Sequence, residues 1–163
     1  MNKINTKKGF TIIEVVLVLA IAGLIFLMVF IALPALQRNQ RDTQRKNDLS
    51  RMQSAVNSYQ ANNRNAVPND TSTINNLLSG YLRVNGDKFA DPSGTDYSIT
   101  LKASGSATDT AQSAAVNGSF EAGKITYWVN ATCRGESVVA STGNAKVALG
   151  MRLEGGGVYC LNN

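Results

Sequence analysis

Glu14 is the charged residue in this sequence whose surroundings most need a chemical explanation. It lies between Ile13 and Val15, and the 19 residues from Val15 to Leu33 include no polar side chain. A helix of that length measures about 29 Å, close to the roughly 30 Å hydrocarbon core of a membrane. A carboxylate at the edge of such a helix is costly, so its presence indicates a function and a partner that offsets its charge.

Other residue types that commonly carry catalysis are few. The sequence has no histidine, which removes the commonest general base and metal ligand, and it has no nucleophile motif or phosphate-binding loop. Its two cysteines, Cys133 and Cys160, suit one disulfide in an exported domain better than a four-ligand metal site. Two free, buried thiols are the alternative. We therefore expect a protein that is not an enzyme.

The net charge of +5 is unevenly distributed. Three lysines precede the apolar run, residues 38–51 carry a further net +3, and residues 52–163 contain eight basic and eight acidic residues. This balance predicts no direct nucleic-acid site in the C-terminal part. The basic residues from Arg38 to Lys46 predict a solvated helix face, or one that faces anionic headgroups or acidic partners.

The segment at residues 8–14 reads KGFTIIE and is followed by the apolar run. It resembles the class III signal of type IV prepilins and their pseudopilin relatives. The resemblance implies that a prepilin peptidase cleaves between Gly9 and Phe10 on the cytoplasmic side and that the new Phe10 amine is N-methylated. It further implies that Glu14 pairs with the Phe10 amine of a neighbouring subunit. In the alternative, Glu14 lies at the level of the lipid headgroups and is satisfied by water.

The resemblance also implies an α+β type IV pilin fold, in which a long N-terminal helix packs on a C-terminal antiparallel β-sheet. It covers residues 3–60 well and the remainder only in layout. We expect a leader peptide at residues 1–9, a long helix at residues 10–62 and a globular head at residues 63–163.

The long helix is expected to have two parts. Residues 10–34 are apolar all round and suit a membrane or a filament core, whereas residues 35–62, the stem, are amphipathic. Pro34 separates the parts and predicts a kink or local melting, because proline lacks one backbone hydrogen bond and clashes with the carbonyl of Phe30. The apolar stripe of the stem consists of Leu49, Met52, Val56 and Tyr59.

The head is expected to form one antiparallel sheet with a single apolar face that the stem covers. Alternating apolar residues and turn signals place strands at residues 97–101, 124–129, 137–140, 146–153 and 158–161. Residues 103–119 are small and polar and predict a long surface loop. The resemblance supports a Cys133–Cys160 disulfide, because many pilins close a C-terminal loop in this way.

Residues 91–97 read DPSGTDY, similar to the D-P-x-G-x-x-Y stretch of pseudopilins and many pilins. Because nearby oxygens can bind calcium in those pseudopilins, Asp87, Asp91 and Asp96 are candidate calcium ligands here. In the alternative, aspartates beside proline and glycine simply build turns.

Taken together, these features predict a structural subunit, major or minor, of a type IV pilus filament that supports adhesion, twitching motility or DNA uptake. The expected partners are further copies of the chain, the prepilin peptidase and methyltransferase, and the pilus assembly platform. Before assembly we expect a single pass of the inner, cytoplasmic membrane with the C-terminus outside, and afterwards a place in the pilus at the cell surface. The alternatives are a pseudopilin of a type II secretion system and a monomeric membrane-anchored binding module.

Overall fold

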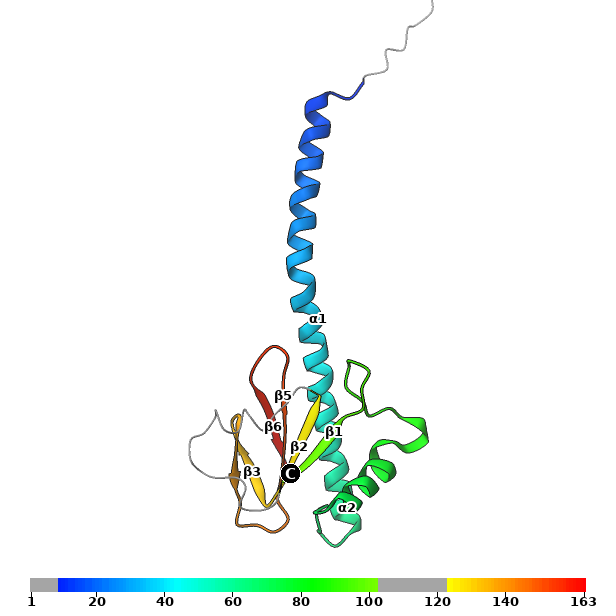
Figure 1. Cartoon of the computed structure of the whole chain (residues 1–163), viewed down its shortest axis with the longest axis vertical. Helices are drawn as coiled ribbons and strands as arrows, with labels where there is room; N and C mark the ends of the chain where they lie inside the picture. The colour runs from blue at the N-terminus through cyan, green and yellow to red at the C-terminus, as the bar shows by residue number, and fades with distance from the viewer. Residues whose placement is uncertain (1–8, 103–122) are drawn as a thin grey trace, which may run out of the picture. The chain divides into compact units, whose positions relative to one another are not determined.

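The structure, a computed structural model, describes residues 9–102 and 123–163 (Figure 1). The chain divides into two compact units, one ending at Arg38 and one formed by Asn39–Asn163. The predicted surface loop at residues 103–119 and all but the last residue of the predicted leader lie outside the described residues.

Helix α1, Ile12–Asn62, contains 51 residues and contributes to both units. In the second unit it carries the predicted apolar stripe: Leu49, Met52 and Val56 are buried, and Tyr59 packs against them. These side chains recur every three or four residues, so they lie on one face of the helix. The predicted stripe is therefore the buried face of the helix in this unit.

The connection from α1 to the sheet contains a short helix, α2, at Thr71–Leu77. Asp70 caps it, since the Thr73 N–H donates to the Asp70 carboxylate at 2.7 Å. A π-helical turn, Leu78–Leu82, and a 3₁₀ turn, Val84–Gly86, follow.

The main sheet has four strands in the order β1-β2-β5-β6. Strands β2 and β5 pair antiparallel, as do β5 and β6. The structure is therefore a long N-terminal helix with an antiparallel-rich C-terminal sheet, as the sequence predicted. The strands are β1 Ser98–Lys102, β2 Lys124–Val129, β5 Val147–Arg152 and β6 Val158–Asn162.

Two details of the predicted sheet are wrong. Strand β1 pairs parallel to β2 instead of antiparallel. The segment 137–140 does not join the main sheet; as β4, Ser137–Ala140, it pairs with the unpredicted β3, Ala131–Arg134, in a separate hairpin. The physical cause lies at Asn130, whose φ of 55° turns the chain out of the sheet directly after β2.

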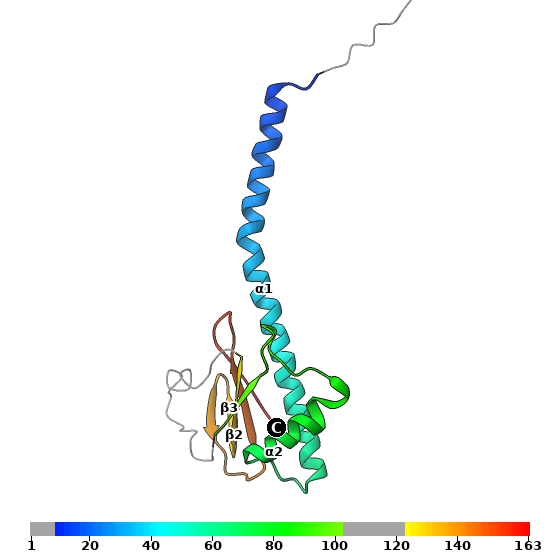
Figure 2. The same ribbon diagram turned by 45° about the vertical axis from the view of Figure 1, so that its right-hand side comes forward.

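The hairpin changes the predicted single apolar face into two buried faces. The larger core cluster joins the stem stripe to side chains of β2 and β5 such as Tyr127 and Leu149. A smaller cluster lies under the hairpin and contains Trp128 and Ala148 from the same two strands. Figures 1 and 2 show the sheet between the stem part of α1 and the β3–β4 hairpin.

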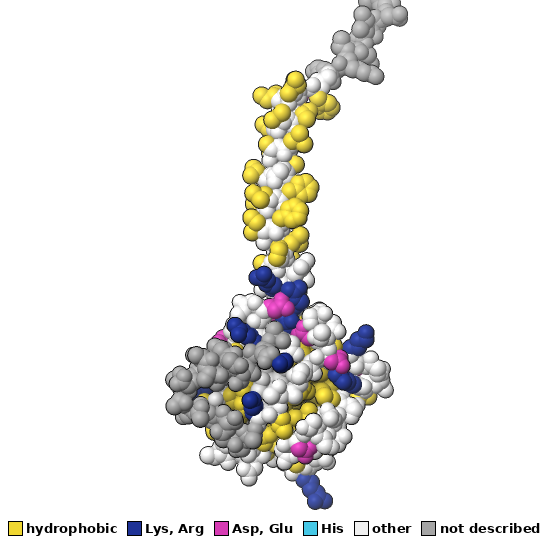
Figure 3. Space-filling model, viewed as in Figure 1, with side chains coloured by type: hydrophobic (Ala, Val, Ile, Leu, Met, Phe, Trp, Pro, Cys, Tyr) yellow, Lys and Arg dark blue, Asp and Glu magenta, His cyan; other side chains and the backbone are white. Residues whose placement is uncertain are grey.

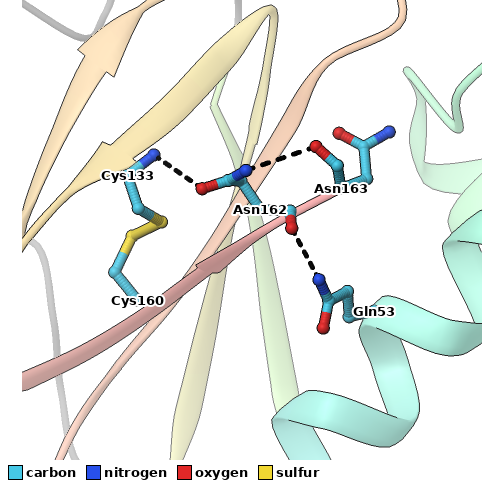
Figure 4. The surroundings of a disulfide bond; sticks show 5 residues. All are labelled: Gln53, Cys133, Cys160, Asn162 and Asn163. Carbon is cyan, nitrogen blue, oxygen red and sulfur yellow. Dashed lines mark hydrogen bonds between the residues drawn. A yellow bond between two sulfur atoms is a disulfide. The ribbon is translucent and has the colours of Figure 1, made fainter.

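The predicted disulfide is present and joins the hairpin to the main sheet. Cys133 on β3 and Cys160 on β6 are bonded with their Cα atoms 5.8 Å apart. Beside the bond, Asn162 connects three elements (Figure 4): its Oδ1 accepts the Cys133 N–H, and its carbonyl accepts Gln53 Nε2 from the stem at 2.6 Å. The disulfide therefore closes a network that reaches from the hairpin to α1.

Replacing both Cys133 and Cys160 by serine should lower the free energy of unfolding by about 3 kcal/mol, because the unfolded chain regains the entropy of a closed loop. Urea unfolding of the full chain in detergent, followed by the fluorescence of the buried Trp128, measures this loss. A reductant should destabilise the native protein by the same amount and leave the double variant unchanged. Equal stability of the oxidised native protein and the variant would contradict the prediction.

Candidate functional site

Thr11 and Glu14 together cap the start of α1. Thr11 immediately precedes the first helical residue, and Glu14 Oε2 accepts hydrogen bonds from the Thr11 N–H at 2.9 Å and from Thr11 Oγ1 at 2.8 Å. In return, the Glu14 N–H lies 3.4 Å from Thr11 Oγ1. This is the reciprocal pattern that a T-x-x-E sequence makes at a helix N-terminus, where the first backbone N–H groups have no helical partner.

The cap uses only one oxygen of the Glu14 carboxylate. No hydrogen bond joins Oε1 to any residue that the structure describes. Phe10, Glu14, Val15, Val18 and Leu19 line a shallow concavity of about 470 Å³ on the helix surface. A second group can therefore approach the carboxylate without breaking the cap.

The apolar half of α1 is uncovered on all sides. Between Ile12 and Leu36 its large apolar side chains are at least 45% exposed, and the Phe10 side chain before them is 90% exposed. Figure 3 shows these side chains along the helix surface. Among the described residues, α1 is the one helix long and apolar enough to cross a membrane, with a mean hydropathy of 3.2 over its best window. Such a surface needs lipid or protein around it.

The residues on either side of the predicted cleavage point precede the helix and are exposed. A side chain at Gly9 would meet no described atom within 4 Å. The Gly9–Phe10 peptide bond is therefore not hindered by the rest of the described chain.

Helix α1 continues through Pro34 without interruption. The local melting that we considered there is not seen, and the kink stays a prediction.

The three candidate calcium ligands do not share a site. Asp91 is 3% exposed and faces Arg45, whereas Asp87 faces Arg51 at 3.1 Å. Asp96 lies 3.3 Å from a different guanidinium, that of Arg83. In residues 9–102 and 123–163, no group of three or more acidic, histidine or cysteine side chains is arranged to hold a metal ion. Each of the three candidates instead pairs with a different arginine.

Arg45 is the residue that sequence reasoning misplaced. We expected a solvated basic face from Arg38 to Lys46, yet Arg45 is 2% exposed. Its Nε donates to Asp91 Oδ2 at 2.6 Å, and its Nη2 donates to Glu154 Oε1 at 2.8 Å. The one local signal is Asp42, three residues earlier on the same helix face, which also pairs with Arg45.

Comparison with known proteins supports the interpretation of the N-terminus. Residues 4–30 match the family model of the prokaryotic N-terminal methylation motif, the type IV prepilin signal. No curated protein and no solved structure matches the chain. The chain carries a type IV prepilin signal on an α+β fold, and the match supports its place in the pilin and pseudopilin family.

The methylation motif bears on how the chain is processed. The motif implies processing by a prepilin peptidase, and it supports membrane anchoring followed by assembly. The motif and the exposed apolar part of α1 both support that course.

Proposed function

We propose that this chain is a structural subunit of a type IV pilus filament and not an enzyme. The observation that carries the proposal is the methylation motif at residues 4–30 together with the N-terminal half of α1, whose large apolar side chains are exposed. A helix of this kind has two environments, the membrane before assembly and a bundle of identical helices afterwards. The subunit, major or minor, serves a filament used in adhesion, twitching motility or DNA uptake.

In this proposal the chain has three parts. The leader, residues 1–9, is removed by the prepilin peptidase, and Phe10 becomes the N-methylated terminus. Residues 10–62 form the long helix, of which residues 10–34 cross the cytoplasmic membrane and then enter the filament core. The head, residues 63–163, lies outside the membrane, and the pilus assembly platform moves the subunit into the filament.

Glu14 has a defined task in assembly. The new Phe10 amine is a cation, and in the packed core it pairs with Glu14 of a neighbouring subunit. Oε2 is already held by Thr11, so the geometry supports a pair through Oε1. An unpaired carboxylate in an apolar core costs several kcal/mol, so the pair sets the axial position at which subunits join.

Mass spectrometry of the chain purified from its own cells tests the processing. The expected mass lacks residues 1–9, includes one added methyl group and lacks two hydrogens because Cys133 and Cys160 are joined. A full-length mass, or cleavage at another bond, would contradict the proposal.

Electron microscopy of antibody-labelled cells separates the two related functions. A pilus subunit appears in surface filaments, and deletion of its gene removes or shortens them. The other candidate, a pseudopilin of a type II secretion system, is favoured equally by the methylation motif. It would give no surface filament, and its loss would stop secretion of proteins to the medium. A monomeric membrane-anchored binding module would form no surface filament, and its loss would not stop secretion. It would also not require cleavage.

A further inference from the structure

A single buried guanidinium holds three parts of the C-terminal unit together. Arg45 lies on the stem and is 2% exposed. It makes a two-pronged contact with Asp91, from Nε to Oδ2 at 2.6 Å and from Nη2 to Oδ1 at 3.0 Å. It also pairs with Glu154 in the turn between β5 and β6 at 2.8 Å and with Asp42 at 3.2 Å. We call these four residues the Arg45 junction.

The carboxylates of the Arg45 junction are themselves fixed by the loops that they join. Asp42 accepts the backbone N–H groups of Glu154 at 2.9 Å and Gly155 at 2.8 Å. A Cβ at Gly155 would lie 3.0 Å from Asp42 Oδ2, so a larger residue there would require the Asp42 carboxylate to shift. The 153–157 turn is thus attached to the stem both by charge and by backbone hydrogen bonds.

Asp91 organises the second loop in the same way. It accepts the Ser93 N–H at 2.9 Å, and its own N–H and carbonyl bond to Thr95 and Gly94, each at 2.8 Å. Burial alone would raise the pKa of Asp91, but the hydrogen bonds from Arg45 and Ser93 outweigh it and the pKa is lowered. Asp91 is therefore an anion that both shapes its loop and binds the guanidinium.

The Arg45 junction brings three carboxylates to one guanidinium. Hydrogen bonds from Arg41 and Arg45 lower the pKa of Glu154, and the bond to Asp91 raises the pKa of Arg45. Arg41 contributes a second cation at the exposed edge, 2.7 Å from Glu154. Without Arg45, the carboxylates of Asp42, Asp91 and Glu154 would stay close together with little compensation, which is strongly unfavourable for buried groups.

We propose that Arg45 is a built-in cation which holds the 91–97 loop and the 153–157 turn on the stem, so that the head does not depend on a bound calcium ion. The calcium ion that the DPSGTDY resemblance implied does not fit, because both oxygens of Asp91 already bind Arg45. The other two candidate ligands, Asp87 and Asp96, face Arg51 and Arg83.

Thermal unfolding of the full chain in detergent tests this role. Arg45→Met keeps an unbranched apolar side chain in place of the aliphatic part of arginine and removes the cation, so the unfolding midpoint should fall by about 10 °C. Arg51→Met is the matched control: it removes a stem guanidinium that also pairs with two aspartates, Asp48 and Asp87, but is 39% exposed. Its midpoint should fall by no more than about 2–4 °C.

Two further measurements separate the cation from simple packing. Hydrogen exchange of the amides at 91–97 and 153–157 should become at least about tenfold faster in Arg45→Met and stay unchanged in Arg51→Met. Arg45→Lys restores a charge without the planar fork, so its midpoint should lie between those of Arg45→Met and the native protein.

Calcium independence is tested on the native protein. Excess EDTA and millimolar calcium chloride should leave its midpoint unchanged. Loss of stability in EDTA, or stabilisation by calcium, would overturn the proposal.

The variants can overturn it as well. An Arg45→Lys midpoint no higher than that of Arg45→Met would do so, as would equal effects of Arg45→Met and Arg51→Met. If Arg45→Met does not fold, Asp91→Asn, which keeps the loop hydrogen bonds, should accelerate exchange at 91–97, and unchanged exchange there would overturn it. None of these results depends on filament formation.

Discussion

Gly9→Val is expected to leave the chain uncleaved, with a drop in processing of about 100-fold or more. A β-branched side chain next to the scissile bond obstructs the peptidase, and small displacements of a reacting bond already cost that much. The substitution should not disturb the protein itself, because a Cβ at this position meets nothing within 4 Å in the described structure. Immunoblotting and mass spectrometry of membranes distinguish precursor from mature chain.

Gly23→Val is a suitable control for this variant. It adds the same side chain at a position that also has open space around it, inside the apolar helix and far in sequence from the cleavage point. It should be cleaved normally. If Gly9→Val were processed at the native rate, the assignment of the cleavage point would be wrong.

Glu14→Gln is expected to be exported and cleaved normally but to form few or no filaments. The amide oxygen can still accept a hydrogen bond from Thr11, so the helix cap survives, while the negative charge is lost. Losing one partner of a buried ion pair costs about 3–5 kcal/mol at each subunit contact, which lowers the association constant by more than about 100-fold. Sheared surface filaments, compared by immunoblot with the membrane pool, measure the effect.

Thr11→Val provides the complementary variant. It removes the Oγ1 hydrogen bond to Glu14 and keeps the carboxylate, so filaments should still form, in reduced amount. If Glu14→Gln assembled as well as the native chain while Thr11→Val did not, the cap and not the charge pair would be the feature that assembly needs.

The sequence predicted the parts of the structure that depend on local pattern. The stem stripe follows from helical spacing, and burial of Leu49, Met52 and Val56 confirms it. The α+β fold and the Cys133–Cys160 disulfide are confirmed as well. The stripe was predicted from its periodicity. The fold and the disulfide were predicted from the layout of the family whose signal residues 8–14 resemble.

The parts that were missed depend on contacts between distant residues. Arg45 meets Asp91 and Glu154, which are 46 and 109 residues away, and no spacing rule relates such positions. The parallel pairing of β1 with β2 is equally invisible, since alternation of side chains does not distinguish parallel from antiparallel neighbours. The hairpin was missed because the left-handed conformation of Asn130 ends β2 without a glycine or proline signal.

The contacts between the stem and the end of the chain affect when the C-terminal unit can fold. Gln53 and Arg45 bind partners in the β5–β6 region, Asn162 and Glu154, each 109 residues later in the chain. At about 5–20 residues per second, synthesis of that stretch takes roughly 5–20 s, during which the stem lacks its partners on β5 and β6. The C-terminal unit therefore cannot close while it is being made. In the proposed topology this interval leaves the head unfolded, and so able to thread across the membrane, until the residues that secure it to the stem have followed.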